Sequence, residues 1–312
     1  MISANNVNHI LKIPLLTKGE SDFSRRGIKE VVNMKSSIKY YLFLLFFISI
    51  KIYSQVNLDT QFELAKKLFE EENYFDAVTE FKRLLFFDSQ KQFTYSANEY
   101  IGQSFKMGGK FSEAVIHFTL AEINAKDEEQ LYNARIEIIR VNILRRTTSK
   151  AIRLLDSLEA DQRFVKKKDE INYWRGWAYI FADEWDKASY AFSKTNSEHE
   201  LKKLVDQVEQ EKYSVTFAQI ISYIFPGAGQ IYTGHYISGL LSLGWNILWG
   251  YISINSFIEE RIFDGLMVTN FLWLRFYMGN IQNAAKFAEE ENRRISNSAL
   301  RYLQNEYKGI KP

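Results

Sequence analysis

A pattern that recurs every 37 residues constrains the fold of this chain more than any other feature of its sequence. Four alanines occupy equivalent positions at this spacing: Ala77, Ala114, Ala151 and Ala188. The residue four positions after each alanine is large and apolar: Phe81, Phe118, Leu155 and Phe192. No proline interrupts the chain between Leu15 and Phe225, which favours long helical stretches. The sequence therefore predicts an all-α fold built from about four repeated helical units.

Three more columns precede the alanines in the same register. Three residues before each alanine lie Tyr74, Phe111, Thr148 and Trp185. Nine residues before lie Leu68, Phe105, Asn142 and Tyr179, and twelve residues before lie Ala65, Gly102, Ile139 and Gly176. The five columns resemble the tetratricopeptide repeat, a pair of antiparallel helices, over residues 57–197. The resemblance implies a helical solenoid in which the small residue of the first helix lets the second helix approach closely. The third copy departs most from the family, because Ile139 replaces the glycine.

Copies of that family usually repeat every 34 residues, so each connection here carries about three extra residues. We place these after the second helix of each pair, near residues 88–95, 125–130 and 159–168. After the fourth copy, Ser197 and Glu200 have the spacing of a capping box. They predict an amphipathic helix within residues 198–213 that closes the end of the stack. His199 is then a surface residue of its first turn, and His117 is a packing residue.

The N-terminal part of the chain contains the pattern of a secretory signal peptide. A basic start at Met34–Lys39 precedes the apolar run Tyr40–Ile50, which is shorter than the roughly 20 residues of a spanning helix. We predict a signal peptide over residues 34–54, cleaved before Gln55. An uncleaved anchor or an apolar core helix would have the same composition. Because a complete signal begins at a methionine, we expect residues 1–33 to come from an upstream start codon.

Composition excludes several classes of functional site. The chain has no cysteine, which excludes disulfides, thiolate zinc sites and a cysteine nucleophile, and its four histidines are widely scattered. Its 40 basic and 38 acidic residues give a net charge of +2, which does not favour a nucleic-acid partner. No recognisable motif pairs a nucleophile with a histidine. We therefore expect no enzymatic activity, no cofactor and no metal.

The C-terminal third of the sequence has the composition of a membrane module. No charged residue occurs from Ser214 to Phe257, and the 22 residues Ile237–Ile258 are enough to span a bilayer. A second apolar run follows a short charged break, and Arg275 interrupts it. We predict a membrane module over residues 214–282, containing a transmembrane helical hairpin, and a helical tail over residues 283–312. Two crossings and three crossings both fit this pattern, and a buried hairpin in a soluble domain is the alternative.

The most distinctive string of the chain lies inside this module. It runs from Pro226 to Gly234 and resembles the P-G-x-G-Q-x-Y-x-G signature of an uncharacterised bacterial envelope family. That family continues with a glycine, an apolar helix that holds an asparagine, and a second helix that ends in Y-x-G-N. The matching residues here are Pro226, Gly227, Gly229, Gln230, Tyr232, Gly234, Gly239, Asn246, Tyr277, Gly279 and Asn280. The family often carries tetratricopeptide repeats upstream, so the resemblance implies an architecture but no activity.

Polar residues inside the module have two possible roles. The glycines do not indicate a phosphate loop, because no strand precedes them and no Lys-Ser or Lys-Thr pair follows, so we expect no nucleotide. Gln230 and Asn246 are expected to hydrogen-bond between helices or, alternatively, to line a substrate path. Spacings of seven and ten residues place Asn270, Tyr277 and Asn280 on one face of a helix.

The tetratricopeptide resemblance also implies a position for a ligand. Ligands of that family usually lie on the concave face, which is lined by the first helix of each pair. The matching positions here are Lys66, Phe69, Gln103, Lys106, Arg140 and Trp177. The three basic residues predict a basic stripe and the two aromatic residues predict apolar anchors, which together suit a peptide with acidic and aromatic side chains. The alternative is a solvated surface on which the next repeat partly covers Trp177.

The sequence thus predicts a membrane-tethered periplasmic protein–protein interaction scaffold of the bacterial cell envelope. The solenoid would lie in the periplasm and the C-terminal module in the inner membrane. The expected partners are a protein or peptide, and membrane lipid. The alternatives are an accessory subunit of an envelope transport or assembly machine, a membrane enzyme whose activity lies in residues 214–282, and a soluble binding module with a buried hairpin.

Overall fold

A computed structural model describes Lys39, residues 57–195 and residues 199–312. The predicted upstream extension and signal peptide fall outside these residues, apart from Lys39. Within the described residues all regular structure is helical and no strand occurs, as the sequence predicts. The chain divides into two units, Met1–Glu63 and Leu64–Pro312, and the second contains most of the described residues.

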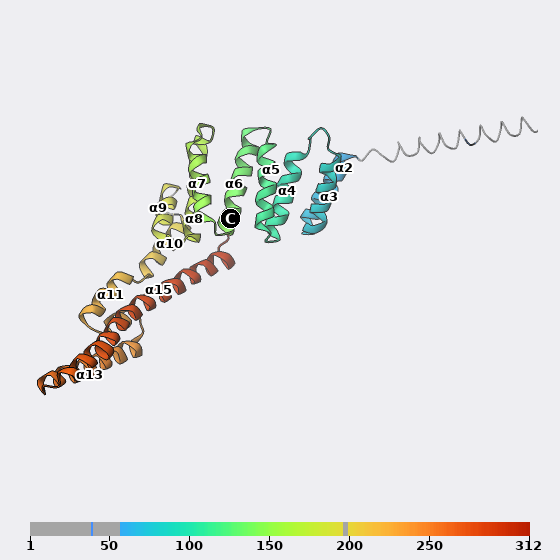
Figure 1. Cartoon of the computed structure of the whole chain (residues 1–312). Coiled ribbons are helices and arrows are strands. Elements are labelled where there is room, and N and C mark those ends of the chain that lie inside the picture. Colours follow the sequence, from blue (N-terminus) through green and yellow to red (C-terminus); the bar gives the residue numbers. More distant parts are fainter. Residues whose placement is uncertain (1–38, 40–56, 196–198) are drawn as a thin grey trace, which may run out of the picture. The chain divides into compact units, whose positions relative to one another are not determined.

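The N-terminal two thirds of the described chain is a series of short helices (Figure 1). They are α2 (Leu58–Glu70), α3 (Tyr74–Phe87), α4 (Thr94–Met107), α5 (Phe111–Ile123), α6 (Glu128–Leu144), α7 (Thr148–Ala160), the 3₁₀ helix η1 (Gln162–Lys167), α8 (Lys168–Phe181), α9 (Trp185–Thr195) and α10 (Glu200–Glu211). From α3 to α10, each α-helix packs against the next one in the chain. The three long connections lie where the 37-residue period predicts them, and η1 forms most of the third.

The repeated alanines and the large residues that follow them lie in the core of this series. All four alanines and all four large residues are completely buried. A β-carbon at Gly102 would lie 2.7 Å from the ring of Phe118, and one at Gly176 would lie 2.5 Å from the ring of Phe192. Real β-carbon contacts are not this short, so these two crossings require a glycine.

The third copy has different residues at the same helix crossing. Ile139 replaces the glycine and Leu155 replaces the phenylalanine, and both are completely buried in one core cluster. A larger residue on the first helix is thus matched by a smaller one on the second. Asn142 replaces an aromatic residue and is also fully buried. Its amide donates to the Ile138 carbonyl and accepts from the Thr147 hydroxyl, which satisfies its polar atoms.

Because each small residue is matched to its partner, exchanging one member should be costly and exchanging both less so. We expect Gly176→Ala to lower the free energy of unfolding by ~1–3 kcal/mol, because its methyl group overlaps the Phe192 ring. Combining it with Phe192→Leu should cost less than the sum of the two single changes. Gly108→Ala is the control, since its β-carbon would make only ordinary contacts. Chemical unfolding of the full chain, followed by circular dichroism, measures all four variants, and strict additivity would contradict the packing argument.

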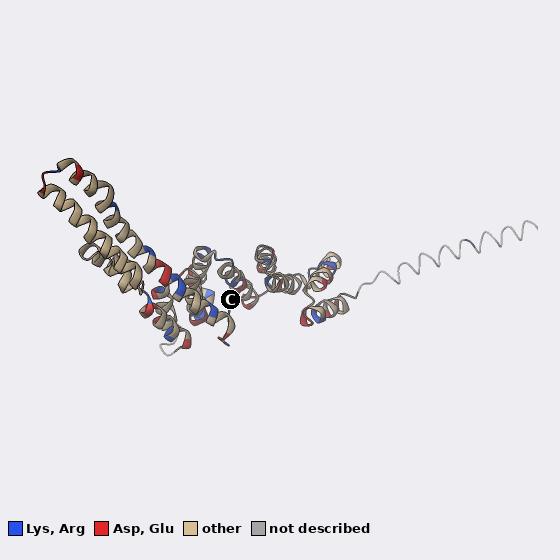
Figure 2. Ribbon diagram, turned by 90° about the horizontal axis from the view of Figure 1, so that it is seen from below, with Lys and Arg blue, Asp and Glu red and all other residues tan. Residues whose placement is uncertain are grey.

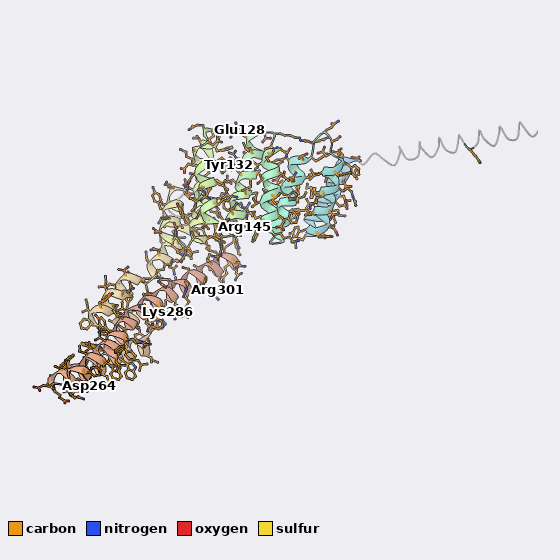
Figure 3. The ribbon with its side chains drawn as sticks, in the orientation of Figure 1. Glu128, Tyr132, Arg145, Asp264, Lys286 and Arg301 are labelled. Carbon is orange, nitrogen blue, oxygen red and sulfur yellow. The ribbon has the colours of Figure 1, made fainter. Side chains whose placement is uncertain are left out.

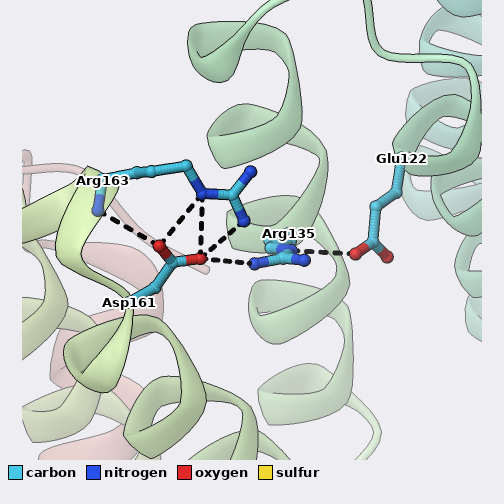
Figure 4. A network of polar contacts seen from close by, with 4 residues as sticks. All are labelled: Glu122, Arg135, Asp161 and Arg163. Carbon is cyan, nitrogen blue, oxygen red and sulfur yellow. Dashed lines mark hydrogen bonds and ion pairs between the residues drawn. The ribbon is translucent and has the colours of Figure 1, made fainter.

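A network of charged side chains joins three consecutive helices of the series (Figure 4). Arg135 on α6 donates to Glu122 on α5 at 2.8 Å and reaches Asp161, the C-cap of α7, at 3.4 Å. Arg163 on η1 also donates to Asp161. This hydrogen bond from Arg163 lowers the pKa of Asp161 to about 2, so its carboxylate stays charged at any physiological pH. The network fixes the connection in which the extra residues of the third repeat lie.

The structure corrects the prediction for the start of α10. The helix begins at Glu200, so Glu200 is its first residue and not its third, and the predicted capping box does not describe this end. His199 is the N-cap, because its Nδ1 accepts a hydrogen bond from the Leu201 amide. Its ring also stacks on Phe192. His117 packs as predicted: it stacks on Phe105, and burial lowers its pKa and favours the neutral ring.

The C-terminal third contains six further helices. They are α11 (Val215–Ile224), α12 (Ala228–Tyr232), α13 (Tyr236–Ile258), α14 (Ile262–Val268), the π-helix η2 (Thr269–Trp273) and α15 (Leu274–Asn305). α11 packs on α15, and α13 packs on α14, η2 and α15. Of the described helices, only α13 is long and apolar enough to cross a membrane. In Figure 2 it carries no charged residue, and charges mark the turn that follows it.

α15 joins two segments that the sequence analysis treated as separate, the end of the second apolar run and the helical tail. It passes through the predicted boundary at residue 282 without interruption and continues to Asn305. Asp264 lies at the outer end of the C-terminal region, and Lys286 and Arg301 follow along α15 toward the helix series (Figure 3). One continuous helix therefore connects the apolar region to the repeated helices.

Candidate functional site

The six predicted groove residues do not form one continuous stripe. Lys106 on α4 and Arg140 on α6 meet at Glu137, one turn before Arg140. The Lys106 Nζ lies 3.0 Å from Glu137 Oε2, and Arg140 pairs with the other carboxylate oxygen. The side chains of Lys106 and Glu137 are only 7% and 10% exposed. Burial lowers the pKa of Lys106, and the Glu137 carboxylate opposes that shift.

The prediction of a free basic stripe is therefore wrong. Glu137 neutralises one of the two bases, and Lys106 is buried, so neither attracts an acidic ligand strongly. Sequence reasoning missed Glu137, although its spacing of three from Arg140 on one helix indicates a possible ion pair.

The three remaining N-terminal groove residues, Lys66, Phe69 and Gln103, lie apart from the cluster around Glu137. Lys66 pairs with Glu70 on its own helix at 3.8 Å. Phe69 contacts the rings of Tyr74 and Tyr100. Both residues and Gln103 are partly exposed. These three residues belong to the surface of the first pairs of helices and not to the cluster around Glu137.

Trp177 is only 2% exposed, so it is not an open apolar anchor. A ring from the C-terminal segment contacts it: the ring of Tyr307 lies 6.0 Å from its ring, centroid to centroid. Tyr307 is itself 6% exposed and belongs to the same core cluster. We refer to residues 306–312 as the tail segment.

The tail segment is held by its main chain as well as by Tyr307. Arg140 donates from its terminal nitrogen to the Lys311 carbonyl at 2.8 Å. The Tyr173 hydroxyl donates to the Ile310 carbonyl and lies 3.3 Å from the Tyr307 hydroxyl. The Arg140 guanidinium also lies 4.8 Å from the centre of the Trp174 ring, which orients it. Arg140, Tyr173 and Trp177 thus form a surface, here named the tail groove, that already holds a peptide segment.

α15 is fixed to the helix series upstream of the tail segment. Asp183, between α8 and α9, accepts hydrogen bonds from Ser296 on α15 at 2.7 Å and from Lys212 at 3.0 Å. Burial alone would raise the pKa of Asp183, but these hydrogen bonds outweigh it and lower the pKa. The ionised carboxylate therefore stabilises the contact of α15 with α8, α9 and α10.

The string from Pro226 to Gly234 contacts the end of the Y-x-G-N motif at a single buried amide, that of Asn280. Asn280 on α15 is 2% exposed. Its Oδ1 accepts from the Gly227 amide, the Gln230 Nε2 and the Ser242 hydroxyl, each at 2.8 Å. Its Nδ2 donates to the Ser222 carbonyl at 3.2 Å. These five residues, which we name the Asn280 cluster, join α11, α12, α13 and α15.

Two glycines of the string permit this close approach. Gly227 has φ +95°, and a β-carbon there would lie 2.2 Å from the Gly239 carbonyl oxygen. A β-carbon at Gly229 would lie 2.3 Å from the Ala218 carbonyl oxygen and 2.6 Å from the Ala284 methyl group. Both positions exclude every other residue because of backbone or helix contact.

The remaining motif residues support the same arrangement. The Tyr277 hydroxyl donates to the Tyr223 carbonyl at 2.6 Å, and the Tyr232 hydroxyl accepts from the Ser214 amide at 3.2 Å. Pro226 is half-buried just before the turn, and Gly234 has φ +84° in the turn before α13. Asn246 is 5% exposed, and Gly279 faces open space on α15.

Asn270 does not share a helix face with Tyr277 and Asn280, although the sequence spacing predicted that it would. Asn270 is exposed, and its amide donates only to the carbonyl of Leu266, four residues earlier in α14. The wide π-helical turn of η2 separates it from Asn280, so a count of whole α-helical turns fails between the two residues.

Comparison with protein-family models, with curated proteins and with solved structures gives no match for this chain. Within the described residues, no group of three or more His, Asp or Glu side chains is arranged to hold a metal ion.

The two asparagines of this region form a matched pair for mutation. Asn280→Ala should leave the Gly227 amide and the Ser242 hydroxyl without their acceptor, at about 1–3 kcal/mol for each buried group, and the Gln230 Nε2 with only the main-chain carbonyl of residue 280. Asn270→Ala should change stability by less than 1 kcal/mol, because only an exposed bond within its own helix is lost. Thermal unfolding of the full chain in detergent compares them, and equal midpoints for the two variants would contradict the central position of Asn280.

Proposed function

We propose that this protein is a membrane-tethered interaction scaffold of a bacterial cell envelope, in which a tetratricopeptide-like helical solenoid binds an extended peptide. Support for the solenoid comes from the series of neighbouring helices and from the matched small and large residues where α4 meets α5, α6 meets α7 and α8 meets α9. In this proposal α13 spans the inner membrane, as one half of a helical hairpin, and the repeated helices face the periplasm after removal of the signal peptide.

The observation that carries the proposal is the way in which the tail groove holds the tail segment. Arg140 and Tyr173 donate to two consecutive main-chain carbonyls, those of Lys311 and Ile310. Main-chain carbonyls are present in every peptide, so these two donors would hold another segment equally well. Trp177 and Tyr173 add the selective part of the contact, because both touch the one aromatic side chain of the segment, Tyr307.

The structure therefore favours a different ligand from the acidic peptide expected from the basic residues. The preferred partner segment would be extended and would carry an aromatic residue three or four positions before the two bound carbonyls. It would displace the tail segment, since both need the same donors. Tyr307 fills that aromatic position within the chain itself.

A peptide with the sequence of residues 305–312 tests this function directly. We expect a fluorescent copy to bind the Tyr307→Ala chain at least about tenfold more tightly than the unchanged chain, in which the tail segment competes. Adding Arg140→Gln to Tyr307→Ala should remove that binding, because one carbonyl loses its donor. Fluorescence anisotropy measures all three proteins.

Arg145→Gln is the matched control in the Tyr307→Ala background, because Arg145 is an exposed arginine at the end of the same helix (Figure 3). It should leave peptide binding unchanged. Equal binding by the Arg140→Gln and Arg145→Gln variants, or equal binding with and without Tyr307, would exclude the tail groove as the peptide site.

A further inference from the structure

Exposed large apolar side chains are concentrated on the first two helix pairs of the series. Within the described helices α2 to α10, all of them except Val165 and Tyr190 lie between Leu64 and Ile123. Phe75, near the start of α3, is 82% exposed. Apolar side chains that gather on an exposed surface usually mark an interaction site, so the surroundings of Phe75 are a candidate.

The repeat does not need an apolar residue at the position of Phe75. Its equivalents in the other three copies are Ser112, Ser149 and Asp186. Each of them is the second residue of its helix, as Phe75 is, and each is exposed. The same helix therefore forms with a polar residue at this point, and the exposed ring of Phe75 is not explained by packing within the repeat.

A groove lies beside Phe75, between α3, the end of α4 and the start of α5, three helices that follow one another in Figure 1. Its volume is about 440 Å³, which is enough for a large side chain with its neighbours. It shares no residue with the tail groove or with the Asn280 cluster. The residues that matter here are Phe75, Val78, Lys82, Phe105, Gly108 and Lys110. We name it the lysine groove.

Two lysines give this groove a positive charge. The Lys82 Nζ lies 5.6 Å from the centre of the Phe105 ring, and Lys110 lines the groove before α5. Among the residues that the structure describes, no carboxylate lies within ion-pair distance of either ammonium group, and no Asp or Glu lines the groove. After burial, the charge of Lys82 is the second cause of the lowered pKa of His117. No other copy has a basic residue at the position of Lys82; the equivalents are Thr119, Asp156 and Ser193.

We propose that the lysine groove docks a segment of a partner protein in which a large apolar side chain lies next to carboxylates. The apolar side chain would pack against Phe75 and Phe105, and the carboxylates would pair with Lys82 and Lys110. The sequence predicts this ligand chemistry for the first helix of each pair, whereas Phe75 and Lys82 belong to α3, the second helix of its pair. The proposal depends neither on the tail groove nor on the membrane location.

Charge decides between a partner protein and a second copy of this chain. In a two-fold pair, the same surface of both copies meets, so Lys82 and Lys110 of one copy would face the same lysines of the other. Like charges that face each other across an interface are costly. A carboxylate-bearing segment of a different protein supplies the missing counter-charge, and its apolar side chain covers the exposed ring of Phe75.

A labelled peptide of the sequence Gly-Glu-Phe-Glu-Phe-Glu-Gly tests the proposal on the full chain in mild detergent. Two comparison peptides have Lys in place of every Glu, or Ala in place of every Phe. We expect the first peptide to bind at least about tenfold more tightly than either, because each comparison peptide loses one kind of contact. Its Kd should rise with salt concentration, since salt screens the two lysines. Fluorescence anisotropy measures all three peptides, and equal binding would overturn the proposal.

Matched pairs of variants locate the bound peptide. Phe86 is on α3 like Phe75 and is 83% exposed, but it does not line the groove. Lys166 is an exposed lysine on η1 and is the control for Lys82. We expect Phe75→Ala and Lys82→Glu each to weaken peptide binding at least about tenfold, and Phe86→Ala and Lys166→Glu to leave it unchanged. All four side chains are exposed, so the melting temperatures should equal that of the unchanged chain.

Four outcomes would overturn the proposal. The first is equal binding by the two members of either pair of variants. The second is competition by excess peptide of residues 305–312, because the probe would then occupy the tail groove. The third is binding of decanoate as tight as that of the peptide and equally dependent on Phe75, since decanoate joins a carboxylate to an apolar chain without a peptide main chain. The fourth is a dimer that sedimentation detects without peptide and that Phe75→Ala dissociates, which would identify a second copy as the occupant.

Discussion

Buried polar contacts along α15 determine how the rest of the C-terminal region is arranged. Near its start, Asn280 gathers α11, α12 and α13 through hydrogen bonds to one amide. Further along, the Asn292 amide bonds both the N–H and the carbonyl of Tyr213, and Ser296 bonds Asp183. Asn280 and Ser296 are buried and would be costly without their partners, and the Asn292 contacts are partly buried. The helix is therefore fixed at several points before the tail segment reaches the tail groove.

This arrangement places the Asn280 cluster and the tail segment at opposite ends of one helix. The tail segment begins after Asn305, so about 38 Å of helix separates it from Asn280 at 1.5 Å per residue. The position of the tail segment depends on α15, and the position of α15 depends on the Asn280 cluster. The tail groove therefore lies at a fixed distance from the apolar region.

The sequence predicted the features that depend on local packing. Gly102 and Gly176 mark close helix crossings because a small residue and a ring must fit within one repeat, and a 37-residue period makes that visible. The string from Pro226 to Gly234 likewise indicated a turn that only glycine permits. Such constraints act between residues close in sequence or repeated along it.

The features that the sequence did not predict depend on distant contacts. Arg140 and Lys311 are 171 residues apart, and no periodic pattern connects them, so the contact of Trp177 with the tail segment could not be expected. The neutralisation of Lys106 depends on Glu137 of another helix pair. Asn270 was placed on the wrong face because a single π-helical turn changes the register.

The occupancy of the tail groove by the tail segment is the central claim of this account. Because the chain has no cysteine, Arg145→Cys and Lys308→Cys introduce the only two thiols, on α6 and in the tail segment, and both positions are exposed. Pulsed electron paramagnetic resonance between spin labels at these positions should give one narrow distance distribution. Adding Tyr307→Ala, or excess peptide of residues 305–312, should broaden it and shift it to longer distances. A broad distribution in the chain that retains Tyr307, unaltered by the peptide, would contradict the account.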